Sequence, residues 1–213
     1  MNYGIMNDDG TLAAKFVTPM TLTSNQPVFT SDTLSLHRRV TKRGAQRWEL
    51  STNLSPLNTS AEELFVNMIL KGHHTQFKIK VPQNIGVIEK DRDTHTINSV
   101  KETPILSRAN VGGHGEVTIS AVDSVSLTKG TFVTLSDDLK VYMVMESTFK
   151  NSTNPITVKL YPELRKTTGT GIKLKYVGVE MQCYYDTDTV QGMVYQDGIL
   201  MDNGTIKLIE ALQ

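Results

Sequence analysis

The sequence predicts a mainly β protein with one short α-helix. Two observations support this fold class: apolar and polar residues alternate with a period of two in run after run, and a single segment has the spacing of a helix. With 213 residues, the chain is long enough for one large or two small domains, and it can bury a core without disulfide bonds.

The first pair of alternating runs, TLSLHRRV and WELSTNL, predicts a long β-hairpin over residues 33–54. Gly44 lies between the runs and can take the positive φ that a tight turn needs. Trp48 is in register with Leu50, so its indole is expected to face the core. The expected tip of this hairpin is basic and carries Arg38, Arg39, Lys42, Arg43 and Arg47.

The one predicted helix covers residues 60–71. Thr59 or Ser60 stands three residues before Glu62 or Glu63, which is the spacing of a capping box, and Gly72 suits the position after the last turn. Apolar residues in between form one stripe at helical spacing, made of Leu64, Phe65, Met68 and Ile69. The run TQFKIKVP follows and predicts a strand that ends at Pro82.

Residues 83–115 have no clear periodicity and are interpreted as a long connection. After it, GEVTISAV, GTFVTLS, LKVYMVMESTF and NPITVKLYPEL predict short strands at the spacing of a small barrel or sandwich. A further strand, IKLKYVGVEMQCYY, contains Cys183. A hairpin with its turn at Asn203-Gly204 is predicted to close the chain.

Composition excludes several classes of protein. Lys+Arg and Asp+Glu number 22 each, so the net charge is zero, whereas a dedicated nucleic-acid-binding domain would be basic. Low net charge also makes self-association easier. The single cysteine, Cys183, allows no internal disulfide and no zinc site with two thiolates. The first residues do not resemble a signal peptide and no apolar run is long enough to cross a membrane, so we expect no membrane partner.

We expect no catalytic activity, no cofactor and no metal site. The adjacent His73 and His74 would point to opposite faces of an extended chain and could not easily share one ion. The run DRDTH, at residues 91–95, lacks the glycine and the glutamate of a calcium loop. The chain has no G-x-S-x-G motif, and GGHG at residues 112–115 lacks the lysine of a phosphate-binding loop.

The basic tip permits two interpretations. In the first, its arginines bind phosphates and Trp48 stacks on bases. In the second, the arginines meet carboxylates on a neighbouring subunit, since the planar guanidinium pairs with carboxylates through two hydrogen bonds. The register of Trp48 with Leu50 favours the second interpretation.

The order of these motifs resembles the distal tail protein family of tailed bacteriophages. The hairpin RR…GAQRWEL, the corner LSPL, the capped helix and the strand TQFKIKVP resemble the N-terminal region of that family. In the second half, LTKGTFVTLSDDLKVYMV, VKLYPELR and DGILMDNGTIKLIEAL resemble later segments. Residues 1–20 and 83–110 lie outside the resemblance. The matching positions in the first half are Gly44, Gln46, Arg47, Trp48, Pro56, Leu57, Phe77 and Pro82.

The resemblance implies an N-terminal split β-barrel or sandwich with one helix, and a small β-barrel of the oligonucleotide/oligosaccharide-binding (OB) type. The N-terminal domain would span residues 1–84 and be completed by residues 173–213. Residues 85–114 would be the long connection, and residues 115–172 the small barrel.

The resemblance also implies a structural role in the virion. Such proteins form a ring, commonly a hexamer, between the tail tube and the tip, hub or baseplate proteins, and are assembled in the host cytoplasm. Nucleic acid would be present only as DNA passing through the ring. The basic tip would then contact acidic residues of the next subunit, with three candidate pairs: Asp8-Asp9, Asp137-Asp138, and Asp186 with Asp188.

Two alternatives stay open. The chain could be a carbohydrate- or receptor-binding β module of a virion or a secretion-like apparatus. The aromatic residues available for this in the second half are Phe132, Tyr142, Phe149 and Tyr161, most of them at alternating strand positions where core packing is expected. The other alternative is a nucleic-acid binder, whose affinity would fall steeply with salt.

Overall fold

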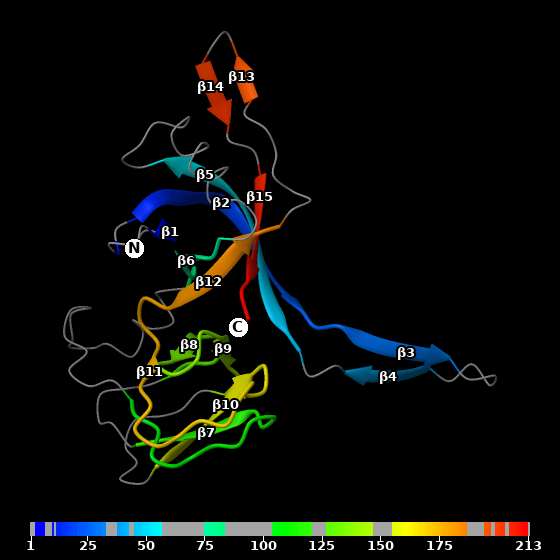
Figure 1. The fold of residues 1–213 in the computed structure, drawn as a ribbon, viewed down its shortest axis with the longest axis vertical. Helices are drawn as coiled ribbons and strands as arrows, with labels where there is room; N and C mark the ends of the chain where they lie inside the picture. The colour runs from blue at the N-terminus through cyan, green and yellow to red at the C-terminus, as the bar shows by residue number, and fades with distance from the viewer. Residues whose placement is uncertain are drawn as a thin grey trace. The chain divides into compact units, whose positions relative to one another are not determined.

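The described part of the chain is all-β in the computed structural model (Figure 1). The predicted helix over residues 60–71 and the predicted turn at Gly44 both lie outside it. The structure describes residues 3–6, 10, 12–32, 38–42, 45–56, 75–83, 104–120, 127–146, 155–186, 194–196, 199–202 and 205–212.

The chain folds into two compact units. The first comprises Met1–Lys80 and Met181–Gln213, and the second comprises Val81–Glu180. The second unit therefore extends beyond the predicted barrel at residues 115–172. Leu106, from the predicted connection, and Leu174, from the predicted return segment, are both buried in its core.

The first unit contains a closed six-stranded barrel. Many of its buried side chains come from alternate positions of the strands, as in Phe77 and Ile79 of β6, and the alternation in the sequence located these. In β15, by contrast, Leu208, Ile209 and Glu210 are buried in succession. Trp48 is buried, as predicted. In order around the barrel, the strands are β1 (Gly4–Met6), β2 (Leu12–Asn25), β5 (Arg47–Pro56), β15 (Thr205–Glu210), β12 (Glu180–Tyr185) and β6 (Phe77–Lys80).

The predicted hairpin over residues 33–54 is wrong. The strand β4 (Arg38–Lys42) pairs with β3 (Val28–Asp32), not with β5. In β5, Leu50 has Leu22 of β2 on one side and Leu208 of β15 on the other. Pairing within the barrel buries Trp48 and Leu50, whereas the polar β4 has no such face to bury.

The predicted closing hairpin is also wrong, for the same reason. Its second strand, β15, pairs with β5 and β12, which buries Ile206 and Leu208 in the barrel. The hairpin that forms consists instead of β13 (Val194–Gln196) and β14 (Ile199–Asp202). Asn203 and Gly204 themselves lie outside the described residues.

The second unit contains a five-stranded sheet, and four of its strands were predicted as separate runs. Its fifth strand, at residues 174–175, was predicted as one long strand with β12, which belongs to the barrel. The segment 104–107 joins its two edges, since Leu106 N donates to Ile172 O at 2.8 Å and Ser107 N donates to Thr118 O at 2.9 Å. Thirteen buried residues form one core inside this unit, among them Tyr142. In sheet order, the strands are β11 (Leu174–Lys175), β8 (Phe132–Leu135), β9 (Val141–Val144), β10 (Ile156–Tyr161) and β7 (Glu116–Ile119).

Gly112 allows two segments of the second unit to approach closely. A Cβ at this position would lie 2.9 Å from the carbonyl carbon of Lys166 and 3.0 Å from the backbone nitrogen of Thr167. Both neighbours are backbone atoms, so a rotamer change cannot make room. Gly169, in contrast, has open space where its Cβ would be.

We therefore expect Gly112→Ala to destabilise the second unit by about 1–3 kcal/mol, the usual cost of overpacking. Gly169→Ala is the matched control and should change stability by less than about 1 kcal/mol, because it only restricts the unfolded chain. Hydrogen exchange of the amides in β7 to β10 during denaturant titration would measure both. Equal protection in the two variants would contradict the packing argument.

Candidate interaction surface

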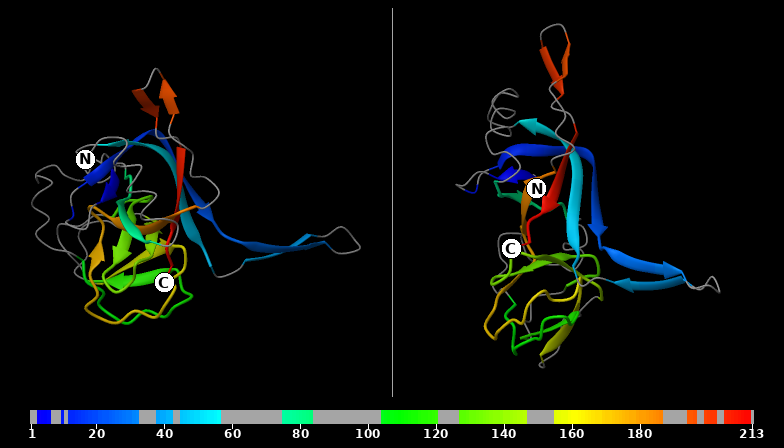
Figure 2. Two further views of the ribbon diagram at one scale, coloured as in Figure 1. Left: turned by 45° about the horizontal axis from the view of Figure 1, so that its top comes forward. Right: turned by 45° about the vertical axis from the view of Figure 1, so that its right-hand side comes forward.

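The strands β3 and β4 form an arm, defined here as residues 28–32 and 38–42. Their ladder runs from Val28 opposite Lys42 to Asp32 opposite Arg38, and it forms a two-stranded sheet of its own. Figures 1 and 2 show the arm extending away from the barrel of the first unit. Every side chain described in it is exposed. An isolated two-stranded ribbon is only marginally stable in water.

The arm carries apolar side chains on both of its faces. Residues directly opposite each other in an antiparallel ladder share a face, so Val28 and Val40 lie on one face and Phe29 on the other. Their exposed fractions are 48% for Val28, 57% for Val40 and 55% for Phe29. The arm thus exposes apolar side chains on each face, where a second protein surface could cover them.

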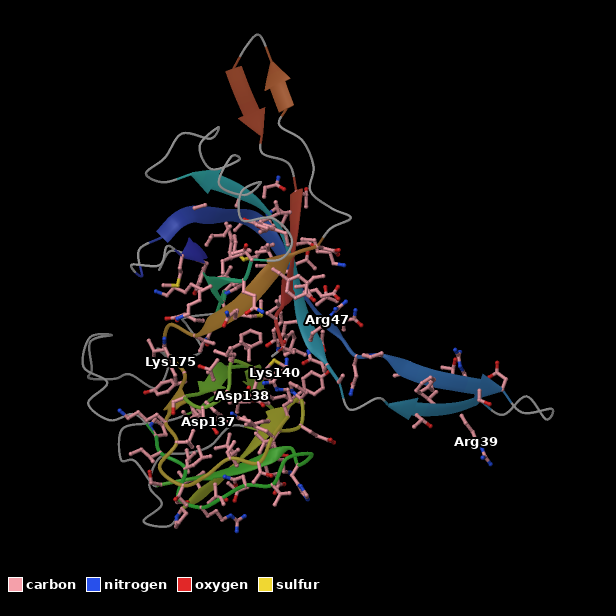
Figure 3. The ribbon with its side chains drawn as sticks, in the orientation of Figure 1. Arg39, Arg47, Asp137, Asp138, Lys140 and Lys175 are labelled. Atoms are coloured by element: carbon pink, nitrogen blue, oxygen red, sulfur yellow. The ribbon has the colours of Figure 1, made fainter. Side chains whose placement is uncertain are left out.

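The charge of the arm comes mainly from β4. Arg38 stands opposite Asp32, and Arg39 stands opposite Ser31. Neither arginine forms an ion pair with a carboxylate in the described part of the chain. Figure 3 shows Arg39 pointing away from the ribbon. A guanidinium in this position is available to a carboxylate or phosphate on another molecule.

The structure separates the five cations of the interface hypothesis. Arg38, Arg39 and Lys42 lie together on β4, although the side chain of Lys42 is not described. Arg43 lies outside the described residues. Arg47 belongs to β5 at the base of the arm, where its Nε donates to Glu49 Oε1 at 3.1 Å.

A network of charged groups holds the base of the arm. Glu49 accepts a hydrogen bond from Asn25 Nδ2 at 2.7 Å and pairs with Lys207 Nζ at 3.0 Å, in addition to Arg47. Lys207 also contacts Asp186 at 3.1 Å. Burial acts to raise the pKa of Glu49, but the hydrogen bonds and positive charges outweigh it and lower the pKa below the usual 4.5. This network ties together β2, β5 and β15.

The acidic pairs proposed as partners of the arm are engaged within the chain or lie outside the described residues. Asp138 is completely buried, so this residue cannot meet an arm, and its part of the prediction is wrong. Asp137 lies 3.8 Å from Lys166, and Asp186 pairs with Lys207. The residues outside the described ranges are Asp8, Asp9 and Asp188.

Buried polar groups in the second unit form a structural network. Tyr142 Oη donates to Asp138 Oδ2 at 2.7 Å, and Arg165 Nη2 donates to Asp138 Oδ1 at 3.1 Å. Burial, more than the neighbouring carboxylate, raises the pKa of the Tyr142 phenol. Because Tyr142 is fully buried, it cannot stack on a sugar, and Phe132 and Tyr161 are only partly exposed. Phe149 lies outside the described residues.

The structure places some of the other candidate features of the sequence. Cys183 is buried in β12, and burial raises the pKa of its thiol. Histidine, cysteine and carboxylate side chains form no group of metal-ligand type in the residues that are described. Among the same residues there is no helix of the length and apolarity that a membrane crossing requires. The histidines singled out earlier, His73, His74 and His95, lie outside them.

The sequence interpretation missed the strand β3. Val28, Phe29 and Thr30 have strong strand propensity, but this run is too short to show a period of two. A signal was nevertheless present, since three residues of this kind follow Pro27 in an otherwise polar stretch. This signal predicts a strand at residues 28–30 that could pair with β4.

Comparison with known proteins adds no family to this picture. No protein-family model and no curated protein matches the chain. The functional argument therefore depends on the surface and on the order of motifs in the sequence.

The network around Glu49 should make stability depend on pH. We expect Glu49→Gln to lower the free energy of unfolding by about 1–2 kcal/mol at neutral pH, because two ion pairs are lost while the oxygen that accepts from Asn25 can remain. Since the pKa is lowered on folding, this difference should be complete above pH 4.5 and shrink as the pH falls through the folded-state value.

Denaturation followed by the fluorescence of Trp48, the only tryptophan, would measure this effect. Glu146→Gln is the control, because the Glu146–Lys159 pair is exposed and should contribute less than about 1 kcal/mol. A Glu49→Gln variant with unchanged stability, or a difference that persists at low pH, would contradict the role given to the network.

Proposed function

We propose that this chain is a structural protein of a phage virion that assembles into a ring at the distal end of the tail. The family that the sequence resembles suggests a hexamer. The observation that carries the proposal is the arm, a separate two-stranded ribbon whose described side chains are all exposed. Ribbons of this kind become stable when another surface covers them. The sequence resemblance to distal tail proteins supplies the biological setting.

The proposed fold assignment is a split β-barrel for the first unit and an OB-type barrel for the second. Closure of the five-stranded sheet by residues 104–107 supports the latter. In the proposed virion, the ring joins the tail tube protein to the tip, hub or baseplate proteins and has a structural, non-catalytic role. Its assembly takes place in the host cytoplasm, and DNA passes through it without being a specific ligand.

The mixed character of the arm favours a protein partner over a nucleic acid. Val28, Phe29 and Val40 would be covered in a protein interface but would gain little beside a phosphate backbone. Arg39 and its neighbours would pair with carboxylates at the rim. A chain with zero net charge also has no general attraction to DNA.

The proposal predicts that the purified protein forms rings and that the arm is required for them. The variant R39E/K42E/R43E reverses three charges. It keeps Arg38, which stands opposite Asp32 in the ladder, and the Arg47–Glu49 ion pair. It should remain folded, with an unchanged melting temperature of the barrel. The protein concentration needed for assembly should rise at least tenfold. Light scattering after gel filtration, with electron microscopy of negatively stained particles, would measure this.

The matched control is K15E/R108E/K173E, which reverses three other exposed cations. It should assemble as the wild type does. A wild-type protein that stays monomeric at high concentration, both alone and with the tube protein, would refute the ring. An arm variant that assembles normally would reduce the arm to a solvated hairpin.

A further inference from the structure

Two small sheets in the described part of the chain keep open edges: the arm and the hairpin β13–β14. The barrel is closed, and residues 104–107 join the edges of the five-stranded sheet. The two open sheets have similar size, with strands of five residues in the arm and of three and four residues in the hairpin. Unpaired strand edges are templates for pairing with another chain.

The arm and the hairpin leave the barrel at opposite ends. The arm continues from the end of the β2–β5 ladder at Asn25 opposite Arg47. The hairpin precedes Thr205 of β15, which pairs with Asn53. Asn53 lies six positions after Arg47 in β5, which corresponds to about 20 Å along an extended strand. Figures 1 and 2 show the two elements extending in different directions, and within the described residues they belong to separate sheets.

The charges of these two elements are complementary in the sequence. Residues 26–47, which contain the arm, carry five cations and one carboxylate, Asp32. Residues 187–204, which contain β13 and β14, carry three carboxylates and no lysine or arginine. The three carboxylates are Asp188, Asp197 and Asp202. Opposite charges of this kind steer association and suppress pairing between like elements.

We propose that the arm of one copy of the chain pairs, edge to edge, with the β13–β14 hairpin of a second copy. The resulting intermolecular sheet would have four strands, whereas a two-stranded ribbon alone is only marginally stable and sheets of three or more strands can be stable. The hairpin of the first copy and the arm of the second stay available, so the contact is head to tail and generates a closed ring when the rotation permits. This inference rests on the proposed ring and names the surface that receives the arm.

Reciprocal charge reversal tests the pairing. The arm variant is R39E/K42E/R43E, and the hairpin variant is D188K/D197K/D202K. Each should need at least a tenfold higher protein concentration to assemble, because its arm and hairpin then carry charge of the same sign. An equimolar mixture of the two variants should assemble again, since every arm then meets a hairpin of opposite charge. Light scattering after gel filtration at low salt, with circular dichroism to verify folding, gives the readout.

The outcomes separate this inference from the proposed function. A hairpin variant that assembles like the wild type, together with an arm variant that does not, would overturn the pairing and leave the ring intact. Two deficient variants that fail to assemble when mixed would also overturn it. A wild-type protein that never assembles would refute the ring itself. The control variant K15E/R108E/K173E should assemble alone and gain nothing from mixing.

Chemical cross-linking tests the same contact without changing the charges. The native Cys183 is fully buried, so engineered cysteines would be the reactive ones. With a bismaleimide, the double variant S31C/M201C should give a ladder of covalent oligomers, because arms and hairpins alternate along the assembly. S31C alone should stay monomeric on a denaturing gel. A covalent dimer of S31C would show that arms pair with arms and would overturn the proposal.

Discussion

The first unit depends on the strand β5, which is paired along both edges. Its neighbours β2 and β15 come from opposite ends of the sequence, so one strand gathers segments that are far apart in the chain. A buried carboxylate strengthens the junction, because Trp48 N donates to Glu210 Oε2 at 3.0 Å. Both elements with open edges emerge from the strands around β5. The pairing of β5 with β2 and β15 therefore determines where the arm and the β13–β14 hairpin leave the barrel.

This dependence explains which parts of the fold the sequence could predict. Alternation is a local property, and it located β5, β8, β9, β10 and β12 and the burial of Trp48. Pairing is a long-range property, decided by which apolar faces can be buried together. Adjacent runs were therefore predicted to pair as hairpins at residues 33–54 and around Asn203-Gly204. The second strand of each predicted hairpin, β5 or β15, belongs to the barrel instead. Turn propensity was outweighed by burial of side chains such as Leu50 and Ile206.

The candidate surface was predictable to the same limited extent. The concentration of cations between Arg38 and Arg47 was visible in the sequence, but their division between the arm and its base was not. Arg47 is drawn into the network around Glu49 because Asn25 and Lys207 come from other strands. Asp138 was a candidate partner of the basic tip, yet its carboxylate accepts a hydrogen bond from Tyr142 inside the second unit. The net charge of zero therefore gives no information about where the charges lie. Asp138 is buried in the second unit, whereas Arg38 and Arg39 are exposed on the arm.

The second unit is inserted between two strands that are neighbours in the barrel, β6 and β12. Its points of entry and exit lie side by side, since Val81 N donates to Val179 O at 2.9 Å. A segment whose ends already meet can be exchanged or shortened with little cost in loop-closure entropy for the host. The closure of the barrel therefore does not depend on the length of the inserted unit, and changes within that unit should leave the pairing of β6 with β12 in place.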